Sequence, residues 1–169
     1  FDTVREALSR PQGPSASDRA AARIVVVLGA HAPAVRAAID FRDARVIECP
    51  DWAGGLSHSL RCGLRALADD ADGNRAGHAA SDASAPSAAL VMLGDTPFVT
   101  AGELRSLIAA WQAAPDTPAA AQYDGTIGAP CILPRGVWPE LAALQGDQGA
   151  GAWLRGRRAA GFPVTSMSL

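Results

Sequence analysis

The sequence contains no lysine, since all 15 of its basic residues are arginine, and 17 acidic residues leave a formal charge of −2. A slightly acidic chain without an excess of basic residues lacks the basic face of a nucleic-acid binder, so we expect no nucleic-acid partner. No apolar run approaches the roughly 20 residues of a membrane-spanning helix, and no secretory leader opens the chain, so we expect no membrane association. The spacings of Cys49, Cys62 and Cys131 fit neither a disulfide framework nor a zinc cluster, which favours a reducing compartment, the cytoplasm.

What the chain does contain is an alternation of strand and helix patterns. Its 169 residues, 49% of them hydrophobic, are enough for one core, so we expect a single domain over residues 1–169. Helices are predicted over 32–40, from a cap at Ser57 to Ala68, and from a Thr100–Glu103 capping box to Ala114. Apolar, partly β-branched runs predict strands at Arg23–Leu28, Ala44–Glu48 and Ala88–Leu93. The alternation predicts an α/β fold, a three-layer Rossmann-like domain with a mainly parallel sheet.

The remaining segments differ in regularity. Residues 69–87 are rich in Ala, Asp, Gly and Ser, which predicts a flexible insertion that lies away from any site. Beyond Pro118 we expect a short extended piece, a glycine-rich loop at Gly125–Gly128 and an extended run over Pro130–Pro134. Helices over 136–144 and 149–158 and a strand over 163–167 complete the pattern.

The most informative local pattern is Leu93-Gly94-Asp95-Thr96-Pro97. An apolar strand ends, and an acid follows at its carboxyl edge, where α/β sheets bind their ligands. A carboxylate in that place can hold Mg²⁺ together with substrate phosphates. The alternative is that Asp95 only orders the turn by accepting backbone hydrogen bonds, and the pentapeptide alone favours that alternative.

Three further segments accompany this turn. They are Asp51–Leu64, with the sequence DWAGGLSHSLRCGL, Gly125–Pro130, with GTIGAP, and Gly146–Ala150, with GDQGA. In this order and at these spacings, from about Arg23 to Phe162, the chain resembles the molybdenum cofactor cytidylyltransferases. These belong to the molybdopterin nucleotidyltransferase-like proteins of the nucleotide-diphosphosugar transferase fold.

The resemblance implies an activity and a set of site residues. It implies transfer of CMP from CTP to the molybdopterin cofactor with release of pyrophosphate, and a molybdenum hydroxylase as recipient of the product. Asp95 matches the catalytic acid that holds Mg²⁺. Ser59 and Gly63, on the helix after the second strand, and Gly94 are assigned to the nucleotide side. The acceptor side is assigned to Gly128, Pro130, Asp147 and Gly149.

The chain also departs from this family. Members open with a strand and a glycine-rich loop carrying an Arg and later a Lys, and many have His where this chain has Ala129. They also continue into an acidic Asp-Thr-Pro segment at the C-terminal end. We therefore expect a domain truncated at both ends, lacking the N-terminal strand and loop, and inactive as a fragment.

Two other functions remain open. The same fold transfers other nucleotides, so guanylyl transfer to molybdopterin or nucleotidyl transfer to a sugar phosphate is one alternative. A non-catalytic carrier of the molybdenum cofactor is the other.

Several conspicuous side chains favour ordinary roles. His31, His58 and His78 share no metal-ligand spacing, although His58 could reach a phosphate. Trp52 could stack on a base or pterin ring, but packing beneath its loop is the more common role of such a residue. We expect packing roles for Trp111, Trp138 and Trp153 and a solvated helix end for Arg155, Arg157 and Arg158.

Overall fold

The computed structural model describes residues 2–8, 23–69 and 86–168, and the chain divides into two compact units. The first, which we call the βαβ unit, combines Gln12–Pro86 with Gln145–Asp147. The second, the mixed-sheet unit, combines Phe1–Pro11, Ser87–Leu144 and Gln148–Leu169. Residues 70–85 of the expected insertion lie outside the described residues. The single domain over 1–169 and the flexible insertion over 69–87 stay predictions.

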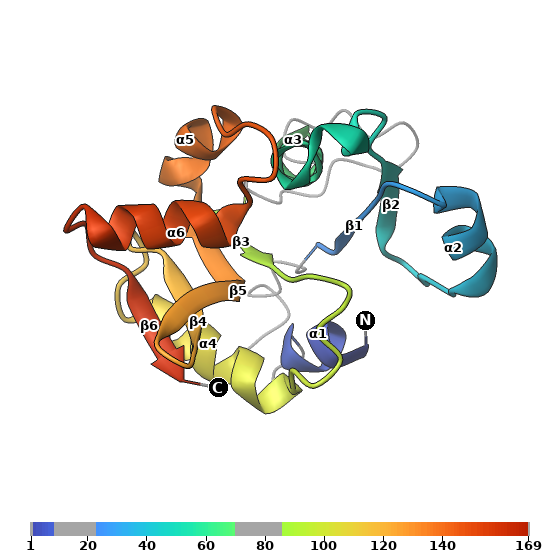
Figure 1. Cartoon of the computed structure of the whole chain (residues 1–169). Coiled ribbons are helices and arrows are strands. Elements are labelled where there is room, and N and C mark those ends of the chain that lie inside the picture. The colour runs from blue at the N-terminus through green and yellow to red at the C-terminus, as the bar shows by residue number, and fades with distance from the viewer. Residues whose placement is uncertain (1, 9–22, 70–85, 169) are drawn as a thin grey trace. The chain divides into compact units, whose positions relative to one another are not determined.

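The βαβ unit is built on two short parallel strands (Figure 1). Strand β1 (Val25–Leu28) pairs in register with β2 (Arg45–Glu48), so that Val25 lies opposite Arg45 and Leu28 opposite Glu48. The connection runs through α2 (Ala32–Ala38), which has a proline in its first turn. Both strands and this helix lie within one or two residues of their predicted bounds.

Helix α3 (Leu56–Asp69) packs against both strands of this unit. It follows the short 3₁₀ helix η2 (Trp52–Gly54) and begins one residue before Ser57. Ser57 therefore lies inside the first turn of the helix. The prediction that Ser57 caps the helix is wrong. Gly63 faces β1, where an added Cβ would come within 3.2 Å of Val27 Cγ2, so the glycine permits close helix–strand packing.

The same unit contains a disulfide between Cys49 and Cys62. The expectation that the cysteines fit no disulfide framework is wrong. Cys49 directly follows β2 and Cys62 lies on α3, and the return of the helix along the strands brings the two Cα atoms to 6.0 Å. A spacing of 13 residues carries no hint of this pairing, because a strand–loop–helix return creates it.

The mixed-sheet unit has four strands in the order β3-β5-β4-β6. Strand β5 (Thr126–Pro134) pairs antiparallel with β3 (Ala88–Val91) and with β4 (Ala119–Tyr123), and β4 pairs in parallel with β6 (Thr165–Ser168). The α/β class is therefore confirmed, but in this unit the sheet is mixed. The expectation of one sheet holding the first three predicted strands does not match the recorded pairing, since β3 pairs with β5.

A hairpin turn explains the antiparallel pairing. Asp124 (φ 44°) and Gly125 (φ 82°) both have positive φ and form a two-residue turn between β4 and β5. Such Asp-Gly turns match the twist of paired strands. The predicted glycine-rich loop at Gly125–Gly128 is therefore wrong, because β5 already begins at Thr126.

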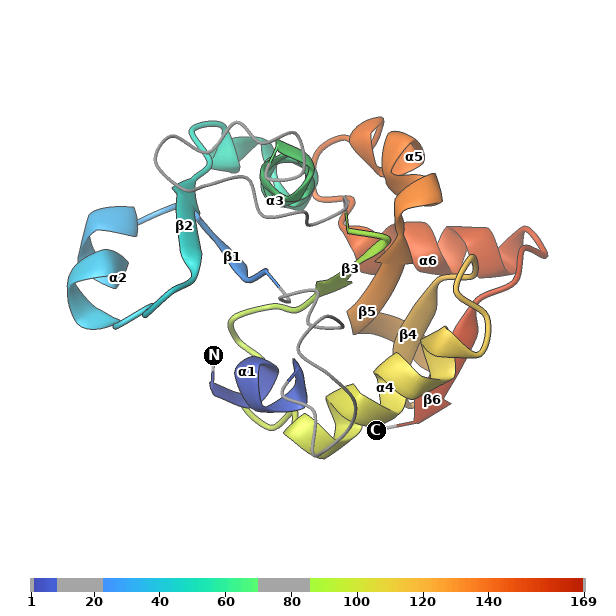
Figure 2. The same ribbon diagram turned by 180° about the vertical axis from the view of Figure 1, so that it is seen from behind.

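Helices cover both faces of this sheet (Figures 1 and 2). On one face lies α4 (Ala101–Gln112), whose Leu107 packs in a cluster with Ala119 and Ile132. The other face carries α6 (Ala150–Ala159), which packs on β5. The short helices α1 (Asp2–Leu8), packed on α4, η3 (Arg135–Val137) and α5 (Trp138–Ala142) complete the unit. Within residues 2–8, 23–69 and 86–168, no helix is long and apolar enough to cross a membrane.

Candidate functional site

Asp95 lies in the loop that connects β3 to α4, four residues beyond the carboxyl end of the strand. Its side chain is exposed, and no described residue forms a hydrogen bond or an ion pair with its carboxylate. The loop is ordered by its neighbours instead. Thr96 Oγ1 donates to the Leu93 carbonyl at 2.8 Å, and Thr100 and Glu103 form the predicted capping box of α4.

Among the residues that the structure describes, Asp95 lacks the hydrogen bonds that are typical of a turn-forming aspartate. A turn-forming aspartate accepts backbone hydrogen bonds, and Asp95 accepts none from the described residues. Its carboxylate oxygens are therefore available to a ligand.

The loop also fits a magnesium ion by its chemistry. Mg²⁺ prefers oxygen ligands, keeps several waters and is held by one or two carboxylates plus substrate phosphates. The described residues contain no group of three or more His, Cys, Asp or Glu side chains that could form an all-protein cage. A single accessible carboxylate suits a metal that the substrate helps to bind. A Cβ added at Gly94 would meet no atom within 4 Å, so the backbone beside Asp95 is open as well.

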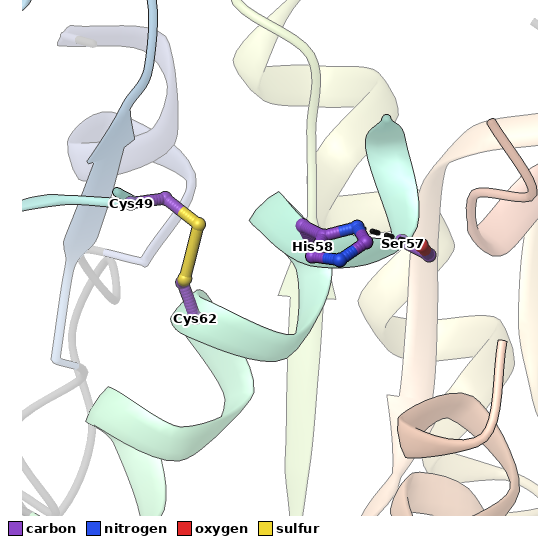
Figure 3. Close-up of a disulfide and its surroundings, with 4 residues drawn as sticks. All are labelled: Cys49, Ser57, His58 and Cys62. Atoms are coloured by element: carbon purple, nitrogen blue, oxygen red, sulfur yellow. Dashed lines mark hydrogen bonds between the residues drawn. A yellow bond between two sulfur atoms is a disulfide. The ribbon is translucent and has the colours of Figure 1, made fainter. Parts of the chain in front are cut away.

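Ser59 lies on α3 in the βαβ unit and is half-buried. Its hydroxyl forms no hydrogen bond with any described residue, so it is available to a ligand. Its neighbours are already engaged (Figure 3): Ser57 is fully buried, and its Oγ lies 3.3 Å from His58 Nδ1. The His58 imidazole packs over Gly54, where an added Cβ would collide with the ring.

Asp147 lies beside the first turn of α3, within the same unit. Gly146 accepts a hydrogen bond from the Ser57 backbone N–H at 3.1 Å. Gly55 has φ 99°, and an added Cβ there would come within 2.6 Å of Asp147 Oδ1. A negative charge near a helix N-terminus is favourable. Asp147 therefore has a structural role that the sequence did not reveal, and its substrate contact stays a prediction.

Gly128, Pro130 and Gly149 lie in the mixed-sheet unit. The pairing of β4 with β5 shifts at Ala120–Ala121, so residues 129 and 130 form a bulge, which contains the cis Ala129–Pro130 bond. Gly149 caps α6, and an added Cβ on Gly151 in the first turn would lie 3.6 Å from the Gly128 Cα. The structure therefore brings the Gly128 segment and the start of α6 together. The Pro130 side chain is fully buried and shapes this strand, and its contact with a substrate stays a prediction.

In the basic cluster on α6, Arg155 and Arg158 are exposed, as expected of a solvated helix end, and two of the three arginines contact other parts of the unit. Arg155 Nη1 donates to the Ile127 carbonyl at 3.0 Å. Arg157 pairs with Glu140 at 3.1 Å, and its guanidinium carbon lies 5.2 Å from the Trp153 ring centroid and 4.8 Å from that of Phe162. Trp111 and Trp138 donate their indole N–H groups to the carbonyls of Pro115 and Leu133. The expected packing roles of these tryptophans are confirmed.

The βαβ unit also contains a cavity that no sequence pattern indicated. A cavity of about 540 Å³ opens at the carboxyl ends of β1 and β2, and we call it the β1–β2 cavity. Its lining includes Glu48, the last residue of β2, which no sequence pattern indicated. The available signal was position: Glu48 ends β2 opposite Leu28, the last residue of β1, and parallel strands bind ligands at that edge.

Comparisons with known proteins agree with an α/β nucleotide-binding protein. The sequence profile of the MobA-like NTP transferase domain matches residues 15–161. The chain belongs to this family and is a nucleotidyltransferase. No curated protein matches the chain.

Three solved structures of similar fold are mycobacterial. Rv0371c of Mycobacterium tuberculosis H37Rv, in a crystal structure of its complex with manganese, is 25% identical, with a TM-score of 0.66 over 99% of this chain and 73% of that chain. A second structure of Rv0371c is also 25% identical, with a TM-score of 0.67 over 99% of this chain and 70% of its own. The Rv0371c homolog from Mycobacterium sp. strain JC1 is 27% identical, with a TM-score of 0.61 over 87% of this chain and 64% of its own.

Proposed function

We propose that this nucleotidyltransferase transfers CMP from CTP to molybdopterin, with Asp95 as the ligand of a catalytic Mg²⁺. The observation that carries the proposal is the Asp95 carboxylate, which is exposed beyond the end of β3 and free of hydrogen bonds to the described residues. Membership of the MobA-like NTP transferase family supports a nucleoside triphosphate as one substrate. The manganese complex of the similar Rv0371c supports a divalent metal.

In the proposed reaction, a terminal phosphate oxygen of molybdopterin bonds to the α-phosphorus of CTP. The bond between that phosphorus and the bridging oxygen breaks, and pyrophosphate leaves. Such transfers depend on positioning and on neutralisation of charge. A bound Mg²⁺ would supply that neutralisation at the phosphates.

The protein's own groups have the task of binding and orientation. The Ser59 hydroxyl holds the nucleoside. On the nucleotide side, Gly63 lets the helix that carries Ser59 pack closely on β1, and Gly94 leaves the backbone beside Asp95 open. The acceptor side is proposed to use Gly128, Pro130, Gly149 and Asp147. No cysteine is suited to covalent catalysis, since Cys49 and Cys62 are joined and burial raises the pKa of the Cys131 thiol to about 12.

A cytoplasmic reaction with delivery to a molybdenum hydroxylase completes the proposal. Disulfides are rare in the cytosol, so a persistent Cys49–Cys62 bond in cells would count against this location. Thiol counting on protein quenched in acid as cells are lysed tests it. Three free thiols would support a reducing compartment, and one would contradict it.

A substrate panel tests the activity. Full-length protein with Mg²⁺ is incubated with molybdopterin and each of CTP, GTP, ATP and UTP, and the nucleotide attached to the pterin is identified by mass spectrometry. The proposal expects CMP-molybdopterin and pyrophosphate from CTP. A GMP product would favour the guanylyltransferase alternative, and cofactor binding without any transfer would favour the carrier.

A further inference from the structure

The β1–β2 cavity lies within the βαβ unit, and neither Asp95 nor Ser59 lines it. Its volume of about 540 Å³ falls within the usual range for small-molecule sites. The lining combines an indole, two prolines, a glycine backbone, a carboxylate and an imidazole, contributed by Trp52, Pro33, Pro50, Gly29, Glu48 and His31. Apolar walls with a few polar groups are typical of sites for planar ligands.

Trp52 forms an aromatic wall that is held in place but not buried. The residue remains 46% exposed. An added Cβ on Gly29 would come within 2.8 Å of Trp52 Cβ and 3.0 Å of Cγ, so the base of the indole packs directly on the glycine backbone. The backbone of Trp52 is fixed by hydrogen bonds to the Cys49 carbonyl at 3.3 Å and from the Gly55 N–H at 3.1 Å. A fixed aromatic ring with an open face suits stacking on a planar ring.

Glu48 supplies an oriented hydrogen-bond acceptor. Arg36 Nε donates to Glu48 Oε1 at 2.9 Å, and Arg36 Nη2 donates to the Val46 carbonyl at 3.2 Å, so the arginine is itself held by β2. The pair engages one carboxylate oxygen and leaves Oε2 for a ligand. A carboxylate accepts hydrogen bonds from an exocyclic amino group and cannot donate one to a carbonyl oxygen.

We infer that the β1–β2 cavity binds a heteroaromatic ring that bears an exocyclic amino group, with Trp52 stacked on the ring and Glu48 accepting from the amino group. The inference rests on the proposed function for its two candidate ligands, because cytosine and pterin both have this chemistry. Uracil and lumazine (2,4-dioxopteridine) carry an oxo group in place of the amino group and would leave Glu48 without a donor.

Isothermal titration calorimetry on the 169-residue chain tests the inference with two matched pairs of probes, cytidine with uridine and pterin with lumazine. We expect one amino ring to bind about tenfold more tightly than its oxo counterpart. Trp52→Leu weakens that binding about tenfold, whereas Trp52→Phe retains most of it. Glu48→Gln removes the preference for the amino ring. Glu140→Gln, which alters another arginine-paired and exposed carboxylate, is the matched control and leaves the preference intact.

The pair that responds identifies whether the cavity takes the nucleoside or the pterin. The inference is overturned if neither amino ring binds, or if folded Trp52→Leu binds both as tightly as wild type. Nucleosides and free pterins are titrated without Mg²⁺ or phosphate groups, so the result does not depend on turnover. CMP transfer at the wild-type rate in Trp52→Leu and Glu48→Gln would contradict this inference alone. Binding in the cavity without any transfer would contradict only the proposed function.

Discussion

Asp95 and Thr96 divide two tasks that a single aspartate often performs in a turn. The threonine hydroxyl bonds to the Leu93 carbonyl and thereby orders the chain after β3. The Asp95 carboxylate next to it forms no hydrogen bond with the described residues. At the scale of single residues, the same contrast separates Ser57, which is fully buried beside His58, from Ser59, whose hydroxyl is uncommitted.

The role of Ser59 can be tested by removing its hydroxyl. If Ser59 holds the nucleoside, Ser59→Ala weakens nucleotide binding by about 1 kcal/mol, the usual net contribution of a neutral hydrogen bond. Stability should change little, because the hydroxyl has no partner among the described residues. Ser106→Ala on α4 is the control, since that serine bonds to the Gly102 carbonyl in its own helix. Equal affinity for CTP in folded Ser59→Ala and wild type would rule out the contact.

Cys131 gives a prediction about pH. Burial raises the pKa of its thiol from the usual 9.0 to about 12, so the folded thiol keeps its proton to higher pH than the unfolded thiol. Its contribution to stability is full below about pH 9 and is lost as the pH rises toward 12. At pH 8.5, iodoacetamide should label no cysteine in the folded protein, Cys131 after unfolding, and all three after unfolding with reductant. Rapid labelling of Cys131 in the folded protein would show that the thiol is not buried.

At the scale of elements, the disulfide links β2 to α3 across the segment that carries Trp52, Ser57 and Ser59. Closing a loop of this length restricts the unfolded chain and stabilises the fold by about 3 kcal/mol. Cys62→Ser should therefore lower the free energy of unfolding by about 2–4 kcal/mol in denaturant titrations without reductant. With reductant, the free energy of unfolding of the wild type should approach that of the variant. If reductant leaves the wild-type midpoint unchanged, the cross-link contributes nothing.

Local patterns carried most of the element predictions. The apolar, partly β-branched runs predicted β1, β2 and β3, and the Thr100–Glu103 capping box marked the start of α4 correctly. The Asp124–Gly125 hairpin was a local signal that the glycines after it obscured. Pairing between distant segments had no local signal: the Cys49–Cys62 bond, the partnership of β3 with β5 and the packing of Asp147 against Gly55 each depend on how the chain returns.

The candidate site was predictable only in part for the same reason. The family resemblance assigned Asp95 and Ser59, and neither side chain forms a hydrogen bond with a described residue. The resemblance also assigned Pro130 to the substrate side; its ring is buried in the sheet, and its substrate contact stays a prediction. The β1–β2 cavity forms where two strands end side by side, so no single segment of the sequence indicates that Glu48 lines a cavity.

At the scale of the whole molecule, the central claim is that Asp95 makes this chain a metal-dependent nucleotidyltransferase. Asn is nearly the size of Asp and keeps a polar group in the loop, so Asp95→Asn should preserve the fold. It removes the charge that Mg²⁺ requires. Asp124→Asn is the matched control, because Asp124 is also an exposed turn aspartate of the mixed-sheet unit, and Asn is well tolerated at its positive φ.

The most direct measurement is pyrophosphate release from CTP and molybdopterin across a Mg²⁺ titration, with full-length wild type, Asp95→Asn and Asp124→Asn. We predict that Asp95→Asn loses most of the metal-dependent rate, by about 100-fold or more if the carboxylate is the principal protein ligand, while Asp124→Asn matches wild type. Thermal melts of all three proteins establish that each is folded. An Asp95→Asn protein with the wild-type rate and the wild-type dependence on Mg²⁺ would contradict the assignment and favour a carrier of the cofactor.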